Sequence, residues 1–315
     1  MGANRPRGIH SMLNARVLAA VAALTFVMHP VEANAQLKVV TSTTDLYDIA
    51  KDVGGNLITA AHIGEGYQDP HFIEAKPSFV LRLRDADVWA FVGLDLEIGW
   101  MPLLLDGAHN PRLQLGKPGY VDVSKAIPVL DVPQGNIDRS QGDVHPLGNP
   151  HYWLDPENGR RIARLFRDRF SQLDPSHAAD YDRNEKAFEG RLNAAEQAWQ
   201  PQLAVIRGKP VIAYHTSWRY FAEYTGMKIV AFMEPKPGVP PSPSHVFEVI
   251  RDAKAAGAKL VIQEPFYERK MSDLVAQQLS GSVLILPPSV GGVKGVDNYI
   301  ELMKHDIDAL AAALK

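Results

Sequence analysis

Two histidines six residues apart stand in a segment that is too rich in proline and glycine to be a regular helix. The segment "DVHPLGNPHYWLDP", residues 143–156, contains His145 and His151. Pro150 comes directly before His151. A proline has a fixed φ and keeps the residue before it extended, so it stiffens a loop. We interpret the segment as a rigid loop that aims an imidazole at a ligand.

Two further histidines stand in comparable places. His71 in "GYQDPHFIEAKPS" also follows a proline and comes after a predicted strand, and His215 in "VIAYHTSWRYF" ends another predicted strand. Ligands of open α/β sheets bind beyond the carboxyl ends of the strands, so the three histidines can converge there. A single loop histidine is more often a surface residue, but three in matching places favour a metal site. Imidazole suits borderline metals such as zinc, and three imidazoles leave a fourth coordination position.

The composition narrows the possible donors and partners. The chain has 315 residues, 46% of them hydrophobic, which is enough for one large domain or, as we favour, two lobes. Its formal net charge of −3 gives no reason to expect nucleic acid or an anionic membrane as a partner. The absence of cysteine excludes disulfides, thiolate metal sites and a lipid-modified N-terminal cysteine. Nitrogen and oxygen must therefore hold any metal.

Residues 1–35 have the pattern of a signal peptide. Arginines precede the apolar run "VLAAVAALTFVM" (17–28), and "EANAQ" (32–36) has the small residues that signal peptidase recognises. We expect cleavage after Ala35. An uncleaved anchor is the alternative, but about a dozen apolar residues fall short of the roughly 20 that span a bilayer. We therefore expect a soluble, exported protein without a membrane anchor, located in the periplasm of a Gram-negative cell.

Strand-like and helix-like segments alternate along the remainder of the chain, in two blocks. Strands are predicted at 37–43, 57–64, 87–93, 209–215, 227–232, 258–264 and 283–287, and helices at 45–54, 77–86, 216–226, 243–257 and 270–281. This alternation is typical of parallel sheets with helices on both faces. We predict two α/β lobes, an N-terminal one at 36–174 and a C-terminal one at 208–315.

The segment between the lobes predicts one long helix at 175–207. Its apolar residues recur at three-, four- and seven-residue steps, with charges between them. At 1.5 Å per residue such a helix would be roughly 45 Å long, which makes it a rigid strut. Pro201 could kink it near its end, because proline removes one helical hydrogen bond. Two shorter helices that break near Gly190 are the alternative.

Several motifs in one order resemble a known family. They are "TSTTDLYDIAKDVGG", "QDPHFIEAKPS", "NPHYWLDPENGRRIA", "VIAYHTSWRYFAEYTG", "PSPSHVFEVI" and "IQEPF". They are similar to the zinc- and manganese-specific solute-binding proteins of bacterial ABC importers, cluster A-I, over nearly all of residues 37–315. The resemblance implies two α/β lobes joined by one rigid helix, with the metal in the cleft between them. It also implies a protein that captures Zn²⁺, with Mn²⁺ as the alternative, and delivers it to a membrane permease; we expect a monomer.

The resemblance also implies the ligands. His71 and His151 would come from the N-terminal lobe and His215 from the C-terminal lobe. The family usually adds an aspartate or glutamate after the last core strand, where this chain has Pro288, which has no ligating side chain. Glu264, at the end of a predicted strand, is the nearest replacement. It could ligate the metal or, as we slightly favour, accept a hydrogen bond that orients His215 or another imidazole.

Three other residues need an interpretation. The family often has a loop rich in histidine and acidic residues before the second histidine ligand, and here residues 131–148 hold only His145, Asp138 and Asp143 of that kind. His145 could be a transient or fourth ligand, but we favour a solvated loop residue. We interpret Glu234 as a loop residue and His245 as a helix-start residue, neither with a ligand role.

Two other functions remain possible. Three histidines with an open position also describe a zinc hydrolase, in which the metal lowers the pKa of bound water to roughly 7. Glu264 could act as its base, but the sequence has neither HExxH nor GxSxG, and we expect that the protein is not an enzyme. A chelated metal or a haem-like ligand in the cleft is a weaker alternative. Three imidazoles favour zinc over manganese, although copper and nickel would also bind in vitro.

Overall fold

The computed structural model describes residues 36–134 and 145–315. The expected signal peptide at 1–35 and two acidic residues of the shortened loop, Asp138 and Asp143, lie outside this part of the chain. In the described part, no helix is long and apolar enough to cross a membrane.

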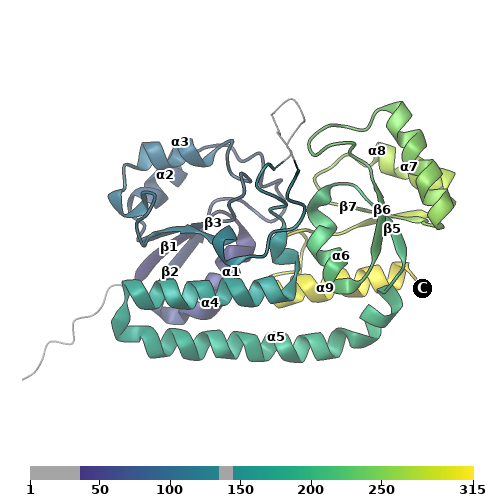
Figure 1. Cartoon of the computed structure of the whole chain (residues 1–315). Coiled ribbons are helices and arrows are strands. Elements are labelled where there is room, and N and C mark those ends of the chain that lie inside the picture. Colours follow the sequence, from purple (N-terminus) through teal and green to yellow (C-terminus); the bar gives the residue numbers. More distant parts are fainter. Residues whose placement is uncertain (1–35, 135–144) are drawn as a thin grey trace, which may run out of the picture. The chain divides into compact units, whose positions relative to one another are not determined.

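Two four-stranded parallel sheets form the framework, as the alternating pattern predicted (Figure 1). The first has the order β2-β1-β3-β4 and the second β6-β5-β7-β8. The strands of the first are β1 Leu37–Thr41, β2 Ile58–His62, β3 Val88–Phe91 and β4 Tyr120–Asp122. Those of the second are β5 Pro210–Ala213, β6 Lys228–Phe232, β7 Leu260–Gln263 and β8 Ser282–Ile285. In each sheet all carboxyl ends lie at one edge, because every pairing is parallel.

The helices accompany these strands. The α-helices are α1 Thr44–Gly54, α2 Pro77–Arg84, α3 Met101–Ala108, α4 Pro156–Leu173, α5 Ala178–Ile206, α6 Arg219–Thr225, α7 Pro243–Ala256, α8 Lys270–Gln278 and α9 Tyr299–Ala313. The 3₁₀ helices include η1 Gly55–Leu57, η2 Pro111–Leu113, η3 Val123–Ala126, η5 Tyr152–Leu154, η6 Pro175–His177 and η7 Thr216–Trp218. The sequence pattern does not predict α3, α4, α9 or β4.

Successive residues of each strand enter different cores. In β1, Val39 packs with α1, α4 and α5, whereas Val40 packs with α2 and α3 on the other face. In β5, Val211 belongs to the same cluster as Val39, and Ile212 packs under α7 and α8. Both faces of each sheet are therefore buried, as expected for parallel sheets. One apolar core continues from the first sheet to the second on the side of α5.

The predicted strut is one continuous helix. α5 runs through Gly190 without a break, which excludes the alternative of two shorter helices, and it retains Pro201 inside the helix. It lies beneath α4 and α9 and extends under both sheets (Figure 1). Its apolar side packs into the shared core through residues such as Phe188, Leu192 and Trp199. The helix therefore joins the two halves as a packed element.

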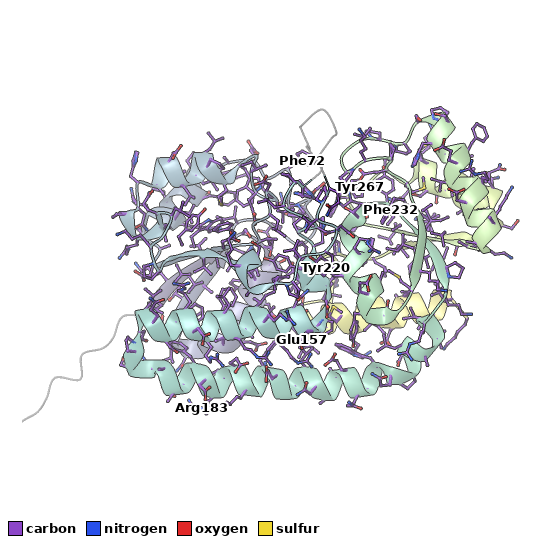
Figure 2. All side chains as sticks on the ribbon, in the orientation of Figure 1. Phe72, Glu157, Arg183, Tyr220, Phe232 and Tyr267 are labelled. Carbon is purple, nitrogen blue, oxygen red and sulfur yellow. The ribbon has the colours of Figure 1, made fainter. Side chains whose placement is uncertain are left out.

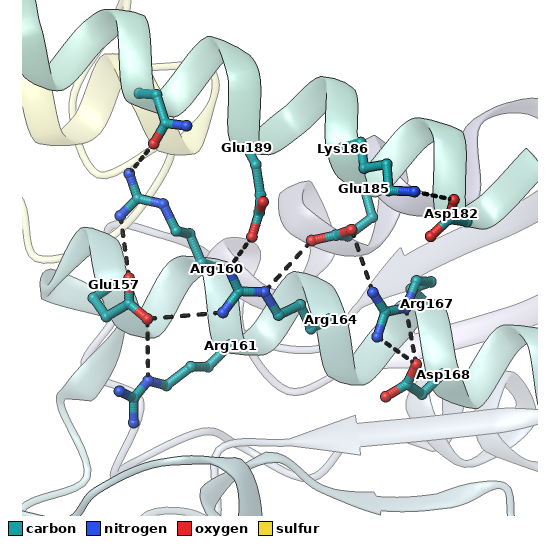
Figure 3. Close-up of polar contacts among 11 residues, drawn as sticks. Glu157, Arg160, Arg161, Arg164, Arg167, Asp168, Asp182, Glu185, Lys186 and Glu189 are labelled. Atoms are coloured by element: carbon teal, nitrogen blue, oxygen red, sulfur yellow. Dashed lines mark hydrogen bonds and ion pairs between the residues drawn. The ribbon is translucent and has the colours of Figure 1, made fainter.

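Ion pairs between charged side chains join α5 to α4 (Figure 3). Glu185, whose side chain is 3% exposed, lies 3.8 Å from Arg164 and 3.5 Å from Arg167. Arg164 also pairs with Glu189, and Arg160 pairs with Glu196 further along the helix. A single exposed ion pair adds little stability, but several charges that form a network contribute more.

Candidate metal site

The three predicted histidines converge between the two sheets. One ring nitrogen of each of His71, His151 and His215 lies within 4.8 Å of the others. His151 and His215 are each 2% exposed, and their ring centroids are 5.1 Å apart. His71 follows β2, His151 precedes η5 and His215 follows β5. The site thus takes two imidazoles from the first half of the chain and one from the second.

Two of the imidazoles are held by the same local motif, an Asp or Asn followed by Pro and His. The Asp69 Oδ1 atom accepts the backbone N–H of His71 at 3.0 Å and lies 2.6 Å from its Nδ1. Asn149 Oδ1 does the same for His151, with both distances 3.0 Å. Because the acceptor holds the proton on Nδ1, each ring presents the Nε2 lone pair to the cleft. The prolines, which the sequence analysis noted as stiffening elements, thus lie inside a repeated turn that orients a ligand.

Glu234 holds the third imidazole. Its Oε2 lies 2.6 Å from His215 Nδ1, and both residues are buried. The Nε2 atom of His215 has no hydrogen-bond partner among the described residues. Glu234 is not among the converging residues, and its interpretation as a simple loop residue missed that this carboxylate orients His215.

His145 is not a solvated loop residue, which corrects the interpretation favoured from the sequence. It is 9% exposed, and its Nε2 atom lies 3.1 Å from His71 Nε2. Its Nδ1 lies 3.0 Å from the carbonyl oxygen of Leu94. Its ring centroid is 5.2 Å from that of His71 and 6.3 Å from that of His151.

Burial keeps two of these imidazoles neutral. It lowers the pKa of His145 to about 3, with repulsion from His71 and His215 acting in the same direction. Burial also lowers the pKa of His151 well below its ordinary value. A neutral imidazole is the form that binds a metal, so these rings are ready to ligate at neutral pH.

Glu264 is not among the residues that converge. Burial raises its pKa to about 8, although the Ser217 side chain lies close enough to lower it in part. The expectation that Glu264 orients His215 is not met, since Glu234 occupies that Nδ1. The structure leaves it a buried carboxyl at the end of β7.

Pro288 does lie at the site. With the three histidines it lines a small cavity that also includes Trp153, Ser217 and Tyr267. Its carbonyl oxygen accepts the indole N–H of Trp153 at 2.7 Å. Tyr267 and Phe72 lie where the two halves face each other (Figure 2). His245, in the first turn of α7, is not part of the cluster; its Nε2 lies 3.0 Å from the carbonyl oxygen of Phe232, the last residue of β6.

Two α/β lobes are thus bridged by a long helix, and three imidazoles converge between them. The chain belongs to the family described as "Zinc-uptake complex component A periplasmic", which matches residues 39–313.

Individual relatives are distant. The chain is 30% identical over 165 residues to the "High-affinity zinc uptake system protein ZnuA" of Brucella abortus (strain 2308), covering 52% of this chain and 49% of the relative. It spans about half the length of the zinc-binding relatives that it matches. It is 26% identical to the "Manganese-binding lipoprotein MntA" of Halalkalibacterium halodurans, over 88% of both chains. A solved structure, "Crystal structure of ZnuA", superposes with a TM-score of 0.73 at 23% identity over 89% of this chain and all of that one, which shows the shared fold.

Proposed function

We propose that this protein captures Zn²⁺ and delivers it to the permease of an ABC importer. The observation that carries the proposal is the convergence of His71, His151 and His215, each with Nδ1 bound to an acceptor side chain. Ligands fixed in this way lose little freedom when the ion arrives, which favours tight capture. Family membership supports the transport role.

Zinc fits the donor set better than manganese does. The described cluster offers imidazole nitrogens and no carboxylate, whereas Mn²⁺ prefers oxygen ligands. The relatives do not decide the metal, because one is named for zinc and another for manganese. We therefore propose Zn²⁺ as the cargo and Mn²⁺ as a weaker competitor.

The remaining sequence-based predictions complete the proposal. We propose that residues 1–35 direct export and are removed, and that the mature chain works in the periplasm as a monomer. We also propose the division into lobes at 36–174 and 208–315 joined by 175–207. The named relatives are binding and uptake proteins, and we propose that this chain likewise does no catalysis.

Metal analysis tests the proposal directly. Protein purified without added metal should contain one zinc per chain, and the bare ion should be the only ligand in a native mass spectrum. Alanine variants of His71, His151 and His215 should each lose zinc affinity and the zinc-induced rise in melting temperature, because the ion stabilises only the folded state that binds it. If two of the three variants keep wild-type affinity, the site lies elsewhere.

Delivery needs a second measurement. We consider a bacterial strain that lacks its own zinc solute-binding protein. It should grow in medium depleted of zinc by a chelator when it expresses this chain together with the permease that belongs to this chain. The His215→Ala variant should not support growth. Hydrolysis of ester or phosphoester substrates by the zinc-loaded protein, lost in the same variant, would instead favour the hydrolase.

A further inference from the structure

We propose that His145 is the fourth metal ligand and completes an all-imidazole shell with His71, His151 and His215. The inference rests on the proposed metal-binding function and adds to it. It assigns the fourth coordination position of the metal, for which Pro288 has no donor in its side chain. It also defines the chemical class of the cargo as divalent cations that prefer nitrogen ligands.

The Nε2 atoms of His71 and His145 approach each other closely. The Nδ1 atoms of His71 and His145 face acceptors, Asp69 Oδ1 at 2.6 Å and Leu94 O at 3.0 Å. In the neutral rings both Nε2 atoms therefore carry lone pairs, and these nitrogens are 3.1 Å apart. Such an arrangement is repulsive unless a proton or a metal ion lies between the two nitrogens. Two nitrogens bound to one tetrahedral zinc at about 2.0–2.1 Å would be about 3.3–3.4 Å apart, close to the observed separation.

The second argument is that the acceptor for His145 is built into the fold. Leu94 and Asp95 have left-handed backbone conformations, with φ of 54° and 65°. The buried carboxylate of Glu97 holds this turn by accepting the N–H of Val92 at 2.8 Å and that of Gly93 at 3.0 Å. Strained backbone of this kind persists only where surrounding contacts maintain it, and it is common at ligand sites. His145 thus has a fixed Nδ1 acceptor, as the other three imidazoles do.

The third argument is the absence of a competing side chain. Among the described residues, the ligand atoms that lie within 4.8 Å of one another include no carboxylate; they do not include His145 either, which meets the cluster through His71. Asp69 and Glu234 are engaged with the Nδ1 atoms of His71 and His215, and Pro288 has no donor in its side chain. A shell of four neutral nitrogens favours Zn²⁺, Co²⁺, Ni²⁺ and Cu²⁺ over Mn²⁺, Mg²⁺ and Ca²⁺.

The number of imidazoles on the metal can be counted with Co²⁺ as the probe. Each bound ring whose Nδ1–H is hydrogen-bonded should give one exchangeable, hyperfine-shifted proton signal in the NMR spectrum. We expect four signals from the wild-type protein and three from His145→Ala. The matched control is His109→Asn, which removes an exposed histidine at a left-handed position that asparagine tolerates, and it should give four. Three signals from the wild-type protein would overturn the inference without any variant.

Zinc affinity gives an independent result. Competition with a chelator should show a loss of at least about 100-fold for His145→Ala and for His145→Gln, beyond the usual effect of residues that only orient a ligand, and no change for His109→Asn. Circular dichroism checks that the variants fold. Tight zinc binding by the wild type with unchanged affinity in both His145 variants would refute the fourth ligand alone. Absence of tight zinc binding by the wild type would instead refute the proposed function.

Discussion

The Nδ1 atom of His215 lies 2.6 Å from Oε2 of Glu234, although the two residues are 19 positions apart. They follow the neighbouring strands β5 and β6, and the pairing continues beyond the strands, since the Glu234 N–H donates to the Tyr214 carbonyl at 3.1 Å. The sheet itself therefore positions the carboxylate against the imidazole. Its negative charge makes the ring a stronger ligand.

Replacement of Glu234 should weaken zinc binding without removing a ligand. Glu234→Gln retains an oxygen that can accept from His215 but loses the charge, and we expect affinity to fall by about 10–100-fold. Glu264→Gln is the matched control, because Glu264 is also a buried glutamate in the same half of the chain. It should leave affinity unchanged in the same competition titration. A larger loss of zinc affinity in Glu264→Gln than in Glu234→Gln would show that Glu264 acts on the metal site.

The repeated turn before His71 and His151 predicts a graded response at Asp69. Asp69→Ala removes the acceptor of both the backbone N–H and Nδ1 of His71, and zinc affinity should fall by about 10–100-fold. Asp69→Asn retains an oxygen in the geometry that Asn149 already uses beside His151, so it should lose less. Equal losses in both variants would show that the charge of Asp69, and not the turn, is what matters.

Most of the framework could be predicted from the sequence, because the pattern that indicates each strand or helix lies within the residues of that element. Alternating apolar strands and helices indicated both sheets, and residues 175–207 indicated the strut. α4 was missed although its signals are local: Asp155 caps it by accepting the Glu157 N–H, and its buried residues Ile162, Phe166 and Phe170 recur at four-residue steps. The three converging histidines could be predicted since each stands at a strand end or after a proline.

The contributions of His145 and Glu234 could not be predicted in this way. The Nδ1 acceptor of His145 is the carbonyl of Leu94, 51 residues away, in a turn that depends on the buried carboxylate of Glu97. The partner of His215 depends on which strands are neighbours in the sheet. Neither relationship leaves a pattern in the sequence around the histidine. The two Asx-Pro-His motifs, by contrast, were visible and could have indicated both turns.

The number of protons released on zinc binding should be small. Because burial lowers the pKa of His145 to about 3 and that of His151 well below its ordinary value, we expect both rings to be neutral in the metal-free protein at pH 6. Of four imidazoles, at most about two can then exchange a proton for zinc at this pH. Calorimetry at pH 6 in buffers with different ionisation enthalpies measures this number. Three or more protons per zinc would show that the buried rings are charged.

Tyr299 connects α9 to the segment that carries His151. Its hydroxyl donates to the Trp153 carbonyl at 2.6 Å, and the ring is fully buried. Tyr299→Phe removes the donor and leaves a buried carbonyl without this partner, so the free energy of unfolding should fall by about 1–3 kcal/mol. Urea unfolding of the metal-free protein measures the change. No loss of stability would mean that another donor replaces the hydroxyl.

Asp45 should make stability depend on pH. Burial raises the pKa of this carboxyl to about 7, whereas an unfolded aspartate titrates near 3.9. Between these values the folded state holds a proton that the unfolded state has lost, so stability falls as the pH rises through this range. Asp45→Asn keeps an oxygen for the Val290 N–H, which Asp45 Oδ1 accepts at 3.0 Å, but it cannot ionise. The variant should therefore lose less stability than the wild type between pH 5 and pH 8.

A control at the neighbouring residue separates titration from the loss of a contact. The Thr44 hydroxyl donates to the Val290 carbonyl at 2.7 Å, so Thr44→Val removes a bond to the same residue without removing an ionisable group. It should lower the free energy of unfolding by a similar amount at every pH, because Asp45 still titrates. Burial also raises the pKa of Glu97 and of Asp306 to about 7, but both are present in every protein compared, and their effect cancels in the difference. Parallel stability curves for the wild type and Asp45→Asn, measured by urea unfolding of metal-free protein from pH 5 to pH 8, would show that Asp45 is already ionised in the folded state.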